Sequence, residues 1–174
     1  MADLKVYKMR SSDLDAVVEI ENESFSLPWS RWMFEREVED SERSHFLLIK
    51  DDNKTLGYIG FWMIFDEAHI VTIAVKGDCR RRGIGTGLMS AALSLAKDLG
   101  ARRATLEVRV TNTPAQNMYE MFGFEIVSIR KKFYTDTGED AYVMWLNDLD
   151  ERFDEIKALW KQAQEKNKNA AKYS

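Results

Sequence analysis

The segment from Ile73 to Leu88 constrains the fold more than any other part of the chain, because it joins an apolar run to a helical pattern through a turn of arginines and glycines. The turn reads Arg80-Arg81-Arg82-Gly83-Ile84-Gly85. A helix N-terminus carries unpaired N–H groups and a partial positive charge, and glycines let an anion approach the backbone closely. The order strand, basic turn, helix therefore predicts an α/β domain with an anion site where the helix begins.

The same residues fit a second interpretation, whereas the best-known phosphate loops do not fit them. Three consecutive arginines also occur in ordinary solvated turns, and glycines before a helix can simply relieve local crowding. A P-loop requires Gly-Lys-Ser/Thr where this chain has Gly85-Thr86-Gly87, and a Rossmann loop requires a third glycine where Leu88 stands. The turn alone therefore indicates either an anion site of another kind or no site.

Periodicity along the rest of the chain predicts an α/β (α+β) fold. Helical spacing covers 14–20, 32–38, 84–99 and 113–122, and strand-like patterns occupy 4–7, 45–50, 56–65, 69–75, 104–110, 124–133 and 142–146. Thr113 and Pro114 predict the start of the fourth helix, with Thr113 in the capping position. We expect a mixed, mostly antiparallel sheet of about seven strands, splayed near Val75, with flanking helices.

Length and the C-terminal pattern predict one domain with an appended helix. A chain of 174 residues is about the size of one folding unit, and we place that domain at residues 1–147. Residues 148–174 are expected to form an amphipathic helix with a frayed tail from Lys166 to Lys172. Its apolar residues recur at steps of three and four, at Phe153, Ile156, Trp160 and Ala163. This seam would dock on the sheet or on another subunit.

Composition excludes several classes of function. The 25 lysines and arginines are outnumbered by 29 acidic residues, and the pI of about 5.3 speaks against nucleic-acid binding. The single cysteine, Cys79, cannot form an internal disulfide, and neither cysteines nor histidines have metal-ligand spacing. No secretory pattern follows Met1, and no run of about 18 apolar residues occurs. We expect a soluble cytoplasmic protein that binds no nucleic acid, membrane or metal.

The segments that follow the arginine–glycine turn continue a known pattern. They are Leu106-Glu107-Val108-Arg109, Asn112, Ala115 and the run from Tyr119 to Phe124. Together with the turn they resemble the GNAT superfamily of N-acyltransferases, in which the turn binds the pyrophosphate of acetyl-coenzyme A. Segments 25–30, 66–68 and 130–134 resemble its RimI-type branch, the ribosomal-protein-alanine N-acetyltransferases. The resemblance covers the chain from about Val6 to Leu146.

This resemblance implies the GNAT fold, acetyl-coenzyme A as co-substrate, and direct acetylation of a protein N-terminus, the N-terminal alanine of a ribosomal protein. It also implies that the strand offers backbone groups to the pantetheine arm and that the turn holds the phosphates. The implied cofactor-binding residues are Ile73, Ala74, Val75, Arg80, Arg81, Arg82, Gly83, Ile84, Gly85, Thr86 and Asn112. By the same resemblance, Glu107 accepts a proton from the amine and Tyr119 donates one to the departing thiolate.

The residue types at positions 107 and 119 suit these roles on chemical grounds. Acetyl transfer needs a neutral amine, a polarised carbonyl and a proton for the thiolate. An α-amine with a pKa of about 7.7–8.0 demands less of a base than a lysine near 10.4, but a glutamate near about 4.3 is weak and must be raised by burial or act through water. Without the motif, a Glu107 that is exposed or paired with Arg109, and a Tyr119 packed in the core, are the commoner interpretations.

The remaining candidates concern the acceptor. Phe25 and Trp29 lie in an aromatic loop that resembles the acceptor-side wall of the family, and Tyr134 is the expected opposite wall. Acidic residues could attract a basic acceptor peptide, namely Asp66, Glu67, Glu139 and Asp140. We expect a monomer or a weak homodimer. Two alternatives stay open: an acetyltransferase for a small amine or a lysine side chain, and a non-catalytic acyl-coenzyme A-binding interaction protein.

Overall fold

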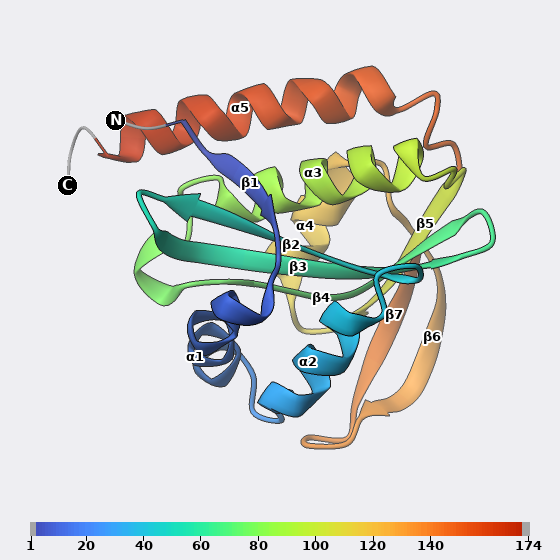
Figure 1. Ribbon diagram of the computed structural model, residues 1–174. Helices are drawn as coiled ribbons and strands as arrows, with labels where there is room; N and C mark the ends of the chain where they lie inside the picture. Colours follow the sequence, from blue (N-terminus) through green and yellow to red (C-terminus); the bar gives the residue numbers. More distant parts are fainter. Residues whose placement is uncertain (1–2, 172–174) are drawn as a thin grey trace.

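The computed structural model describes residues 3–171, in which seven strands form one sheet in the order β1-β2-β3-β4-β5-β7-β6 (Figure 1). The strands are β1 (Lys5–Lys8), β2 (Ser44–Asp51), β3 (Lys54–Ile64), β4 (Glu67–Val75), β5 (Arg103–Arg109), β6 (Glu125–Tyr134) and β7 (Glu139–Leu146). The helices are α1 (Leu14–Ser24), α2 (Arg31–Glu39), α3 (Ile84–Asp98), α4 (Thr113–Met121) and α5 (Phe153–Ala171). The expected mixed, mostly antiparallel sheet with flanking helices is confirmed.

Both faces of the sheet are covered, which explains why its central strands read as continuous apolar runs. The helices α3, α4 and α5 lie on one face, and α1 and α2 lie on the other (Figure 1). Along β2, Leu47 and Ile49 belong to the core that contains α3, whereas Phe46 and Leu48 belong to the core that contains α1 and α2. Successive side chains of a strand point to opposite faces, so this strand contributes to two cores.

The sheet opens between β4 and β5, which form its parallel pair. Their register runs from Glu67↔Arg103 to His69↔Thr105 and stops there. On their other sides, β4 stays paired with β3 through Val75, and β5 stays paired with β7 through its last residue. The splay expected near Val75 therefore begins already after His69, and each of the two diverging strands is held in place by its outer neighbour.

Side-chain caps fix where two of the helices begin. The Ser30 hydroxyl accepts a hydrogen bond from the Met33 N–H at 3.3 Å and starts α2. The side-chain oxygen of Asn112 accepts the Ala115 N–H at 3.3 Å and starts α4. The expectation that Thr113 is the cap was wrong by one residue, because the backbone at Thr113 is already helical and the preceding asparagine satisfies the free N–H group.

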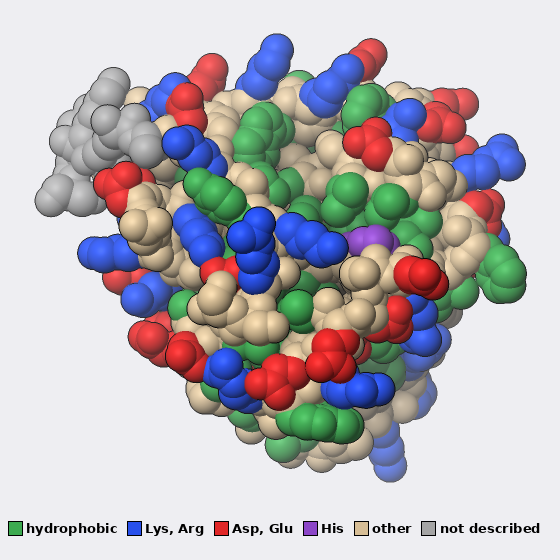
Figure 2. Space-filling model, viewed as in Figure 1, with side chains coloured by type: hydrophobic (Ala, Val, Ile, Leu, Met, Phe, Trp, Pro, Cys, Tyr) green, Lys and Arg blue, Asp and Glu red, His purple; other side chains and the backbone are tan. Residues whose placement is uncertain are grey.

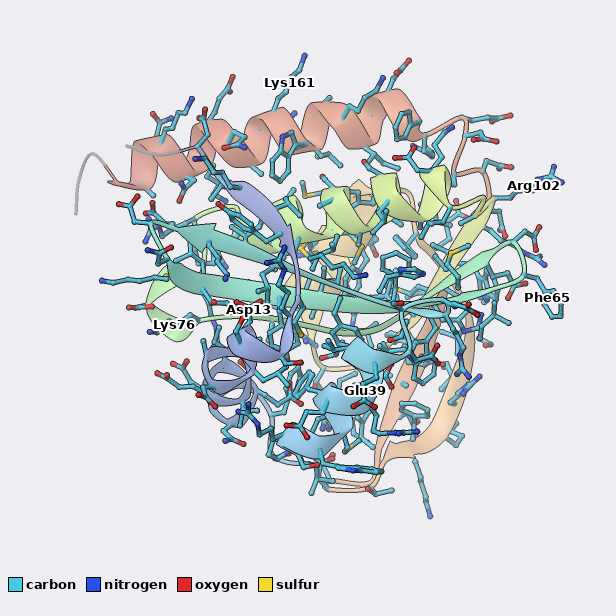
Figure 3. The ribbon with its side chains drawn as sticks, in the orientation of Figure 1. Asp13, Glu39, Phe65, Lys76, Arg102 and Lys161 are labelled. Carbon is cyan, nitrogen blue, oxygen red and sulfur yellow. The ribbon has the colours of Figure 1, made fainter. Side chains whose placement is uncertain are left out.

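The C-terminal helix packs on α3 within the same chain. Ile156, Leu159 and Ala163 are buried in the same core cluster as α3 and the sheet. The Ser90 hydroxyl of α3 donates to the Ile156 carbonyl at 3.3 Å. Charged side chains of both signs lie along the outer side of α5 in Figure 2, and Lys161 points away from the body of the molecule in Figure 3. The apolar seam is therefore covered by this chain's own α3.

The last part of α5 is ordered as a helix. Residues 166–171 continue α5 instead of fraying as expected, and Lys172 lies outside the described residues. Asn167, within this stretch, is only 4% exposed. Between residues 3 and 171, no helix is both long and apolar enough to cross a membrane.

Candidate active site

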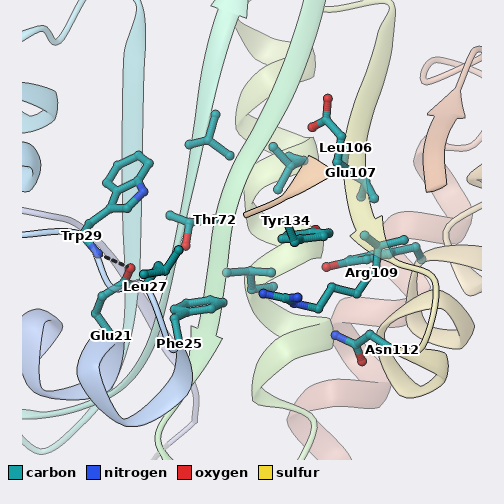
Figure 4. A pocket seen from close by; sticks show the side chains of 15 residues that line it. Glu21, Phe25, Leu27, Trp29, Thr72, Leu106, Glu107, Arg109, Asn112 and Tyr134 are labelled. Atoms are coloured by element: carbon teal, nitrogen blue, oxygen red, sulfur yellow. Dashed lines mark hydrogen bonds between the residues drawn. The ribbon is translucent and has the colours of Figure 1, made fainter. Parts of the chain in front are cut away.

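A cavity of about 260 Å³ lies at the opening between β4 and β5 (Figure 4). Its walls come from both strands, from α4, from the end of β6 and from the loop after α1. The lining residues are Glu21, Phe25, Leu27, Trp29, Ile70, Val71, Thr72, Ile73, Leu106, Glu107, Val108, Arg109, Asn112, Tyr119 and Tyr134. The fold thus brings together the two expected catalytic residues and three of the expected acceptor-wall residues.

Glu107 lines the cavity from β5 with a partly exposed carboxylate. Its side chain is 29% exposed, and its Oε1 lies 3.3 Å from Nη1 of Arg130 on β6. The interpretation that Glu107 is the partner of Arg109 was wrong, because Arg109 instead pairs with Asp136 and Glu139. The guanidinium that faces Glu107 is itself more than half exposed, so this ion pair is solvated and weak. The carboxylate therefore remains available as a proton acceptor.

Tyr119 reaches the same cavity from α4 as a buried, neutral phenol. The residue is 6% exposed, and its ring packs edge-on against Phe124 with the centroids 6.1 Å apart. Burial, with Tyr134 nearby, raises the pKa of Tyr119 above its ordinary value. Among the residues that the structure describes, none hydrogen-bonds to this hydroxyl. The phenol therefore keeps its proton at neutral pH and can donate it to a molecule in the cavity.

The wall opposite the α1 loop is organised by Arg109, whose role the sequence did not indicate. The Arg109 guanidinium carbon lies 3.9 Å from the centroid of the Tyr134 ring. Its nitrogens lie 2.6 Å from Asp136 Oδ2 and 3.3 Å from Glu139 Oε1. Asp136 also accepts a hydrogen bond from Ser26 in the α1 loop, and these contacts lower the pKa of Asp136 to about 2. The β6–β7 hairpin is therefore tied both to β5 and to the loop across the cavity.

Glu21 is a buried carboxylate in the cavity wall that the sequence interpretation missed. The residue is 2% exposed, and its Oε1 accepts the Trp29 N–H at 2.8 Å (Figure 4). Its other oxygen accepts a hydrogen bond from the Tyr58 hydroxyl. Burial raises the pKa of Glu21 to about 7, although the Trp29 N–H acts in the opposite direction. A signal existed, since Glu21 continues the apolar stripe of Leu14 and Val17 at steps of three and four.

Because the pKa of Glu21 is raised, we predict that the Glu21→Gln variant becomes more stable relative to the wild type as the pH rises. Because the folded-state pKa of about 7 exceeds the ordinary value of 4.5, the wild type is stabilised by Glu21 below about pH 4.5 and loses that contribution as the pH rises through about 7. The amide keeps both contacts, with its oxygen accepting from Trp29 and its NH₂ donating to Tyr58, but it does not ionise. Urea unfolding is expected to show the variant gaining about 2–3 kcal/mol on the wild type between about pH 5 and pH 8.

The matched control for this prediction is Glu19→Gln, because Glu19 is an exposed carboxylate on the same helix. Its stability difference from the wild type is expected to stay within about 0.5 kcal/mol across that pH range. A Glu21→Gln difference that is equally flat with pH would contradict the assignment of a near-neutral pKa to Glu21.

The turn before α3 leaves the helix start without a side-chain cap. Gly83 occupies the capping position with a φ of +87°, and among residues 3–171 no side chain hydrogen-bonds to the first turn of α3. Arg81 also has a positive φ, of 64°. A Cβ at Gly85 would lie 3.3 Å from the Met118 sulfur of α4, so glycine keeps this approach open. Uncapped N–H groups with a partial positive charge suit a phosphate group.

The three arginines of the turn have different environments. Arg80 donates through Nε to the Val75 carbonyl at 3.1 Å, which ties the turn to the end of β4. Arg82 donates through Nη2 to Asn167 Oδ1 of α5 at 3.3 Å. Arg81 is exposed, and within residues 3–171 no hydrogen bond or ion pair holds its side chain. Arg81 is therefore the arginine whose side chain can reach an added anion without breaking an existing contact.

Three further expected residues differ in how they relate to the cavity. Ile73 and Asn112 line the cavity, and Asn112 also caps α4. Glu67 does not reach it: its carboxylate lies 2.6 Å from Arg103 Nη2 and 3.0 Å from His69 Nε2, where β4 and β5 are still paired. Glu67 therefore lies outside the acceptor wall, because the strand that carries it enters the opening only several residues later.

The features of this opening define the class of protein. The sheet splays at its parallel pair, and a glycine-rich turn begins a helix at the wide end. A carboxylate and a phenol lie inside the opening. The chain belongs to the acetyltransferase (GNAT) family, whose sequence pattern matches residues 14–124. The expectation of a GNAT-family N-acetyltransferase is thereby confirmed.

Named relatives indicate which branch of the GNAT family this chain resembles. A Bacillus subtilis (strain 168) protein, named provisionally as a [ribosomal protein bS18]-alanine N-acetyltransferase, is 44% identical over 141 residues, which cover 81% of this chain and 93% of that protein. An N-alpha-acetyltransferase of Sulfurisphaera tokodaii is 32% identical, covering 82% and 92%. The crystal structure of the ribosomal-protein-S18-alanine N-acetyltransferase from Escherichia coli matches with a TM-score of 0.76 and 30% identity, covering 82% of this chain and 92% of that one. The resemblance to the RimI-type branch is confirmed.

Proposed function

We propose that this protein transfers an acetyl group from acetyl-coenzyme A to the α-amine of a protein N-terminus, the N-terminal alanine of ribosomal protein bS18. The observation that carries the proposal is the meeting of Glu107 and Tyr119 in one cavity, at the opening that leads to the uncapped start of α3. The names of the relatives support the class of acceptor.

The residues present fit acetyl-coenzyme A as the acetyl donor. Past His69, β4 pairs with no strand of the described chain on the side of the opening, so its peptide groups there can hydrogen-bond to the amides of a pantetheine arm. At the wide end, the amides from Ile84 onward and the exposed Arg81 suit a diphosphate. When bound, acetyl-coenzyme A supplies an acetyl group activated as a thioester.

The two residues in the cavity have complementary proton-transfer roles. Glu107 accepts the proton of the α-ammonium, directly or through a water molecule, because its carboxylate is partly solvated and its ion-pair partner, Arg130, is itself exposed. Tyr119 holds its proton because it is buried. As the neutral amine nitrogen bonds to the acetyl carbon and the C–S bond breaks, Tyr119 donates this proton from Oη to the departing sulfur. The second proton that the nitrogen loses on becoming an amide then returns to the Tyr119 oxygen through solvent. An α-amine needs less assistance from Glu107 than a lysine side chain, whose reference pKa is about 2.5 units higher.

Direct transfer, with both substrates bound together, is supported by the state of Cys79. This thiol is buried, does not line the cavity, and donates to the neighbouring Asp78 carboxylate at 3.2 Å. Burial and the nearby carboxylate raise the pKa of Cys79. A protonated thiol away from the cavity is a poor nucleophile, so an acetyl-cysteine intermediate is not part of the proposed mechanism.

The acceptor side of the cavity is aromatic on both sides. Phe25 and Trp29 face it from the α1 loop, and Tyr134 faces it from β6 (Figure 4). The Trp29 backbone is fixed by Glu21, and Tyr134 is held against the Arg109 guanidinium. We propose that these residues confine a small N-terminal side chain such as that of alanine, while the carboxylate of Glu107 attracts the ammonium group.

Acetylation of a bS18 N-terminal peptide that begins with alanine tests this function. The purified protein is incubated with acetyl-coenzyme A and the peptide, and products are located by mass spectrometry with fragmentation. We expect one acetyl group on the α-amine and no product from a copy whose α-amine is already blocked. Faster acetylation of spermidine, or of a lysine within the blocked peptide, would contradict the proposed acceptor. Binding of acetyl-coenzyme A without transfer to any amine would favour the non-catalytic alternative.

A further inference from the structure

The end of α5 reaches the turn that begins α3, although α5 lies outside the part of the chain that matches the family. The family pattern ends at residue 124, and α5 runs from Phe153 to Ala171. A Cβ placed on Gly83 would lie 3.0 Å from the Ala163 carbonyl oxygen and 3.4 Å from the Lys166 Cβ. The backbone of the turn is therefore in direct contact with α5, at the residue that starts α3.

One side chain of the turn is held by a polar residue of that helix. Arg82 Nη2 donates to Asn167 Oδ1 at 3.3 Å, and Arg82 Nη1 lies 3.9 Å from the Cys79 sulfur. Arg82 Nε is buried and has no hydrogen-bond partner among the described residues. Asn167 is 4% exposed on an otherwise apolar seam that includes Ala163. A partly buried guanidinium whose buried Nε already lacks a partner depends on the hydrogen bonds that its other nitrogens make.

The rest of α5 is fixed along α3, so its far end cannot shift freely. The Ser90 hydroxyl donates to the Ile156 carbonyl at 3.3 Å. A Cβ on Gly87 would lie 3.3 Å from the ring of Trp160, which shows how closely the two helices approach. The contacts pair later residues of α5 with earlier residues of α3, so the helices are antiparallel and the C-terminal end of α5 meets the start of α3 (Figure 1).

We propose that α5 is a clamp for the coenzyme-binding turn, with Asn167 as a positioning residue that acts through Arg82. This inference rests on the proposed binding of acetyl-coenzyme A at the turn. Arg82 is then a structural support of the turn, and Arg81 is the arginine that meets the phosphates. Without Asn167, the Arg82 guanidinium turns toward solvent to satisfy its donors, the Gly83 backbone shifts with it, and the amides from Ile84 onward lose their fixed geometry.

The test is the KM for acetyl-coenzyme A of Asn167→Leu, which removes the acceptor but keeps a side chain of similar size. We expect this KM to rise about tenfold, the effect of losing one hydrogen bond to a charged group, while kcat and the KM for the acceptor peptide stay within about twofold of the wild type. Asn169→Leu is the matched control, because it makes the same change at an exposed position of the same helix and is expected to leave all three constants unchanged.

A second variant tests the same contact between Arg82 and Asn167 if Asn167→Leu folds poorly. Arg82→Met removes the other partner and is expected to raise the same KM by a similar factor, and the double variant is expected to add no further loss, because the two residues act as one unit. Additive losses in the double variant would contradict the proposed route through Arg82. If the wild type binds acetyl-coenzyme A and Asn167→Leu has an unchanged KM for it, the proposed clamp is contradicted while the proposed function still stands. If the wild type does not bind it, the proposed function fails first.

Discussion

Tyr119→Phe is expected to slow acetyl transfer by about a hundredfold or more while leaving the affinity for acetyl-coenzyme A within about twofold of the wild type. The substitution removes one hydroxyl from a buried ring that packs on Phe124, so the packing of α4 is retained. What is lost is the proton that the Tyr119 hydroxyl is proposed to donate to the departing sulfur; the other phenol that lines the cavity, Tyr134, lies against the Arg109 guanidinium on the acceptor side. Steady-state rates with the bS18 peptide and calorimetric titration of acetyl-coenzyme A give the two quantities.

The matched control for this loss is Tyr7→Phe. Tyr7 lies on β1, at the opposite edge of the sheet from β6, and is 44% exposed. Its variant is expected to turn over at the wild-type rate. Turnover by Tyr119→Phe at a similar rate would remove Tyr119 from the mechanism, and the proton would then have to come from Tyr134 or from water.

Gly83→Val is expected to weaken the binding of acetyl-coenzyme A by about a hundredfold or more. Gly83 has a φ of +87°, which a β-branched residue adopts only at a cost of about 1–3 kcal/mol. The added Cβ would also lie 3.0 Å from the Ala163 carbonyl oxygen, so either the turn or α5 must move. Both responses displace the N–H groups that are proposed to hold the diphosphate. Calorimetric titration measures the dissociation constant directly.

Gly100→Val is the control that separates a loss of coenzyme binding from the effect of backbone strain alone. Gly100 has a φ of +99° at the other end of α3, and a Cβ there would have no atom within 4 Å. This control is expected to lose stability by a similar amount and to keep its affinity for acetyl-coenzyme A. Equal affinities for the Gly83 and Gly100 variants would show that the start of α3 does not bind the coenzyme.

Local patterns in the sequence were sufficient for the elements that carry the site. The arginine–glycine turn predicted the start of α3, and strand alternation placed Glu107 on one face of β5. Which strands would separate was predicted only approximately, near Val75, because the end of the β4–β5 ladder at His69 depends on how β3 and β7 hold the outer edges. No local pattern specifies where two adjacent strands stop pairing.

Contacts between segments that are distant in the sequence could not be predicted from local patterns. The alternative in which Arg109 pairs with Glu107 was wrong, since the carboxylates that approach Arg109 come from the β6–β7 hairpin, whose turn geometry is not encoded near position 109. Glu21 and Asn167 left a weak signal, as polar residues at positions that continue an apolar stripe. Such a residue has to find a buried partner, and in this structure those partners are Tyr58 and Arg82.

The central claim is that the turn before α3 binds the diphosphate of the coenzyme and so directs its thioester toward Glu107 and Tyr119. Calorimetric titration of the wild-type protein with acetyl-coenzyme A and with S-acetylpantetheine, which lacks the diphosphate and the adenosine 3′-phosphate attached to it, tests it most directly. We expect saturable one-to-one binding of acetyl-coenzyme A and an affinity for S-acetylpantetheine at least about a hundredfold weaker, because two or more charge-assisted hydrogen bonds are lost. Equal affinities for the two compounds, or no heat of binding with acetyl-coenzyme A, would contradict the claim.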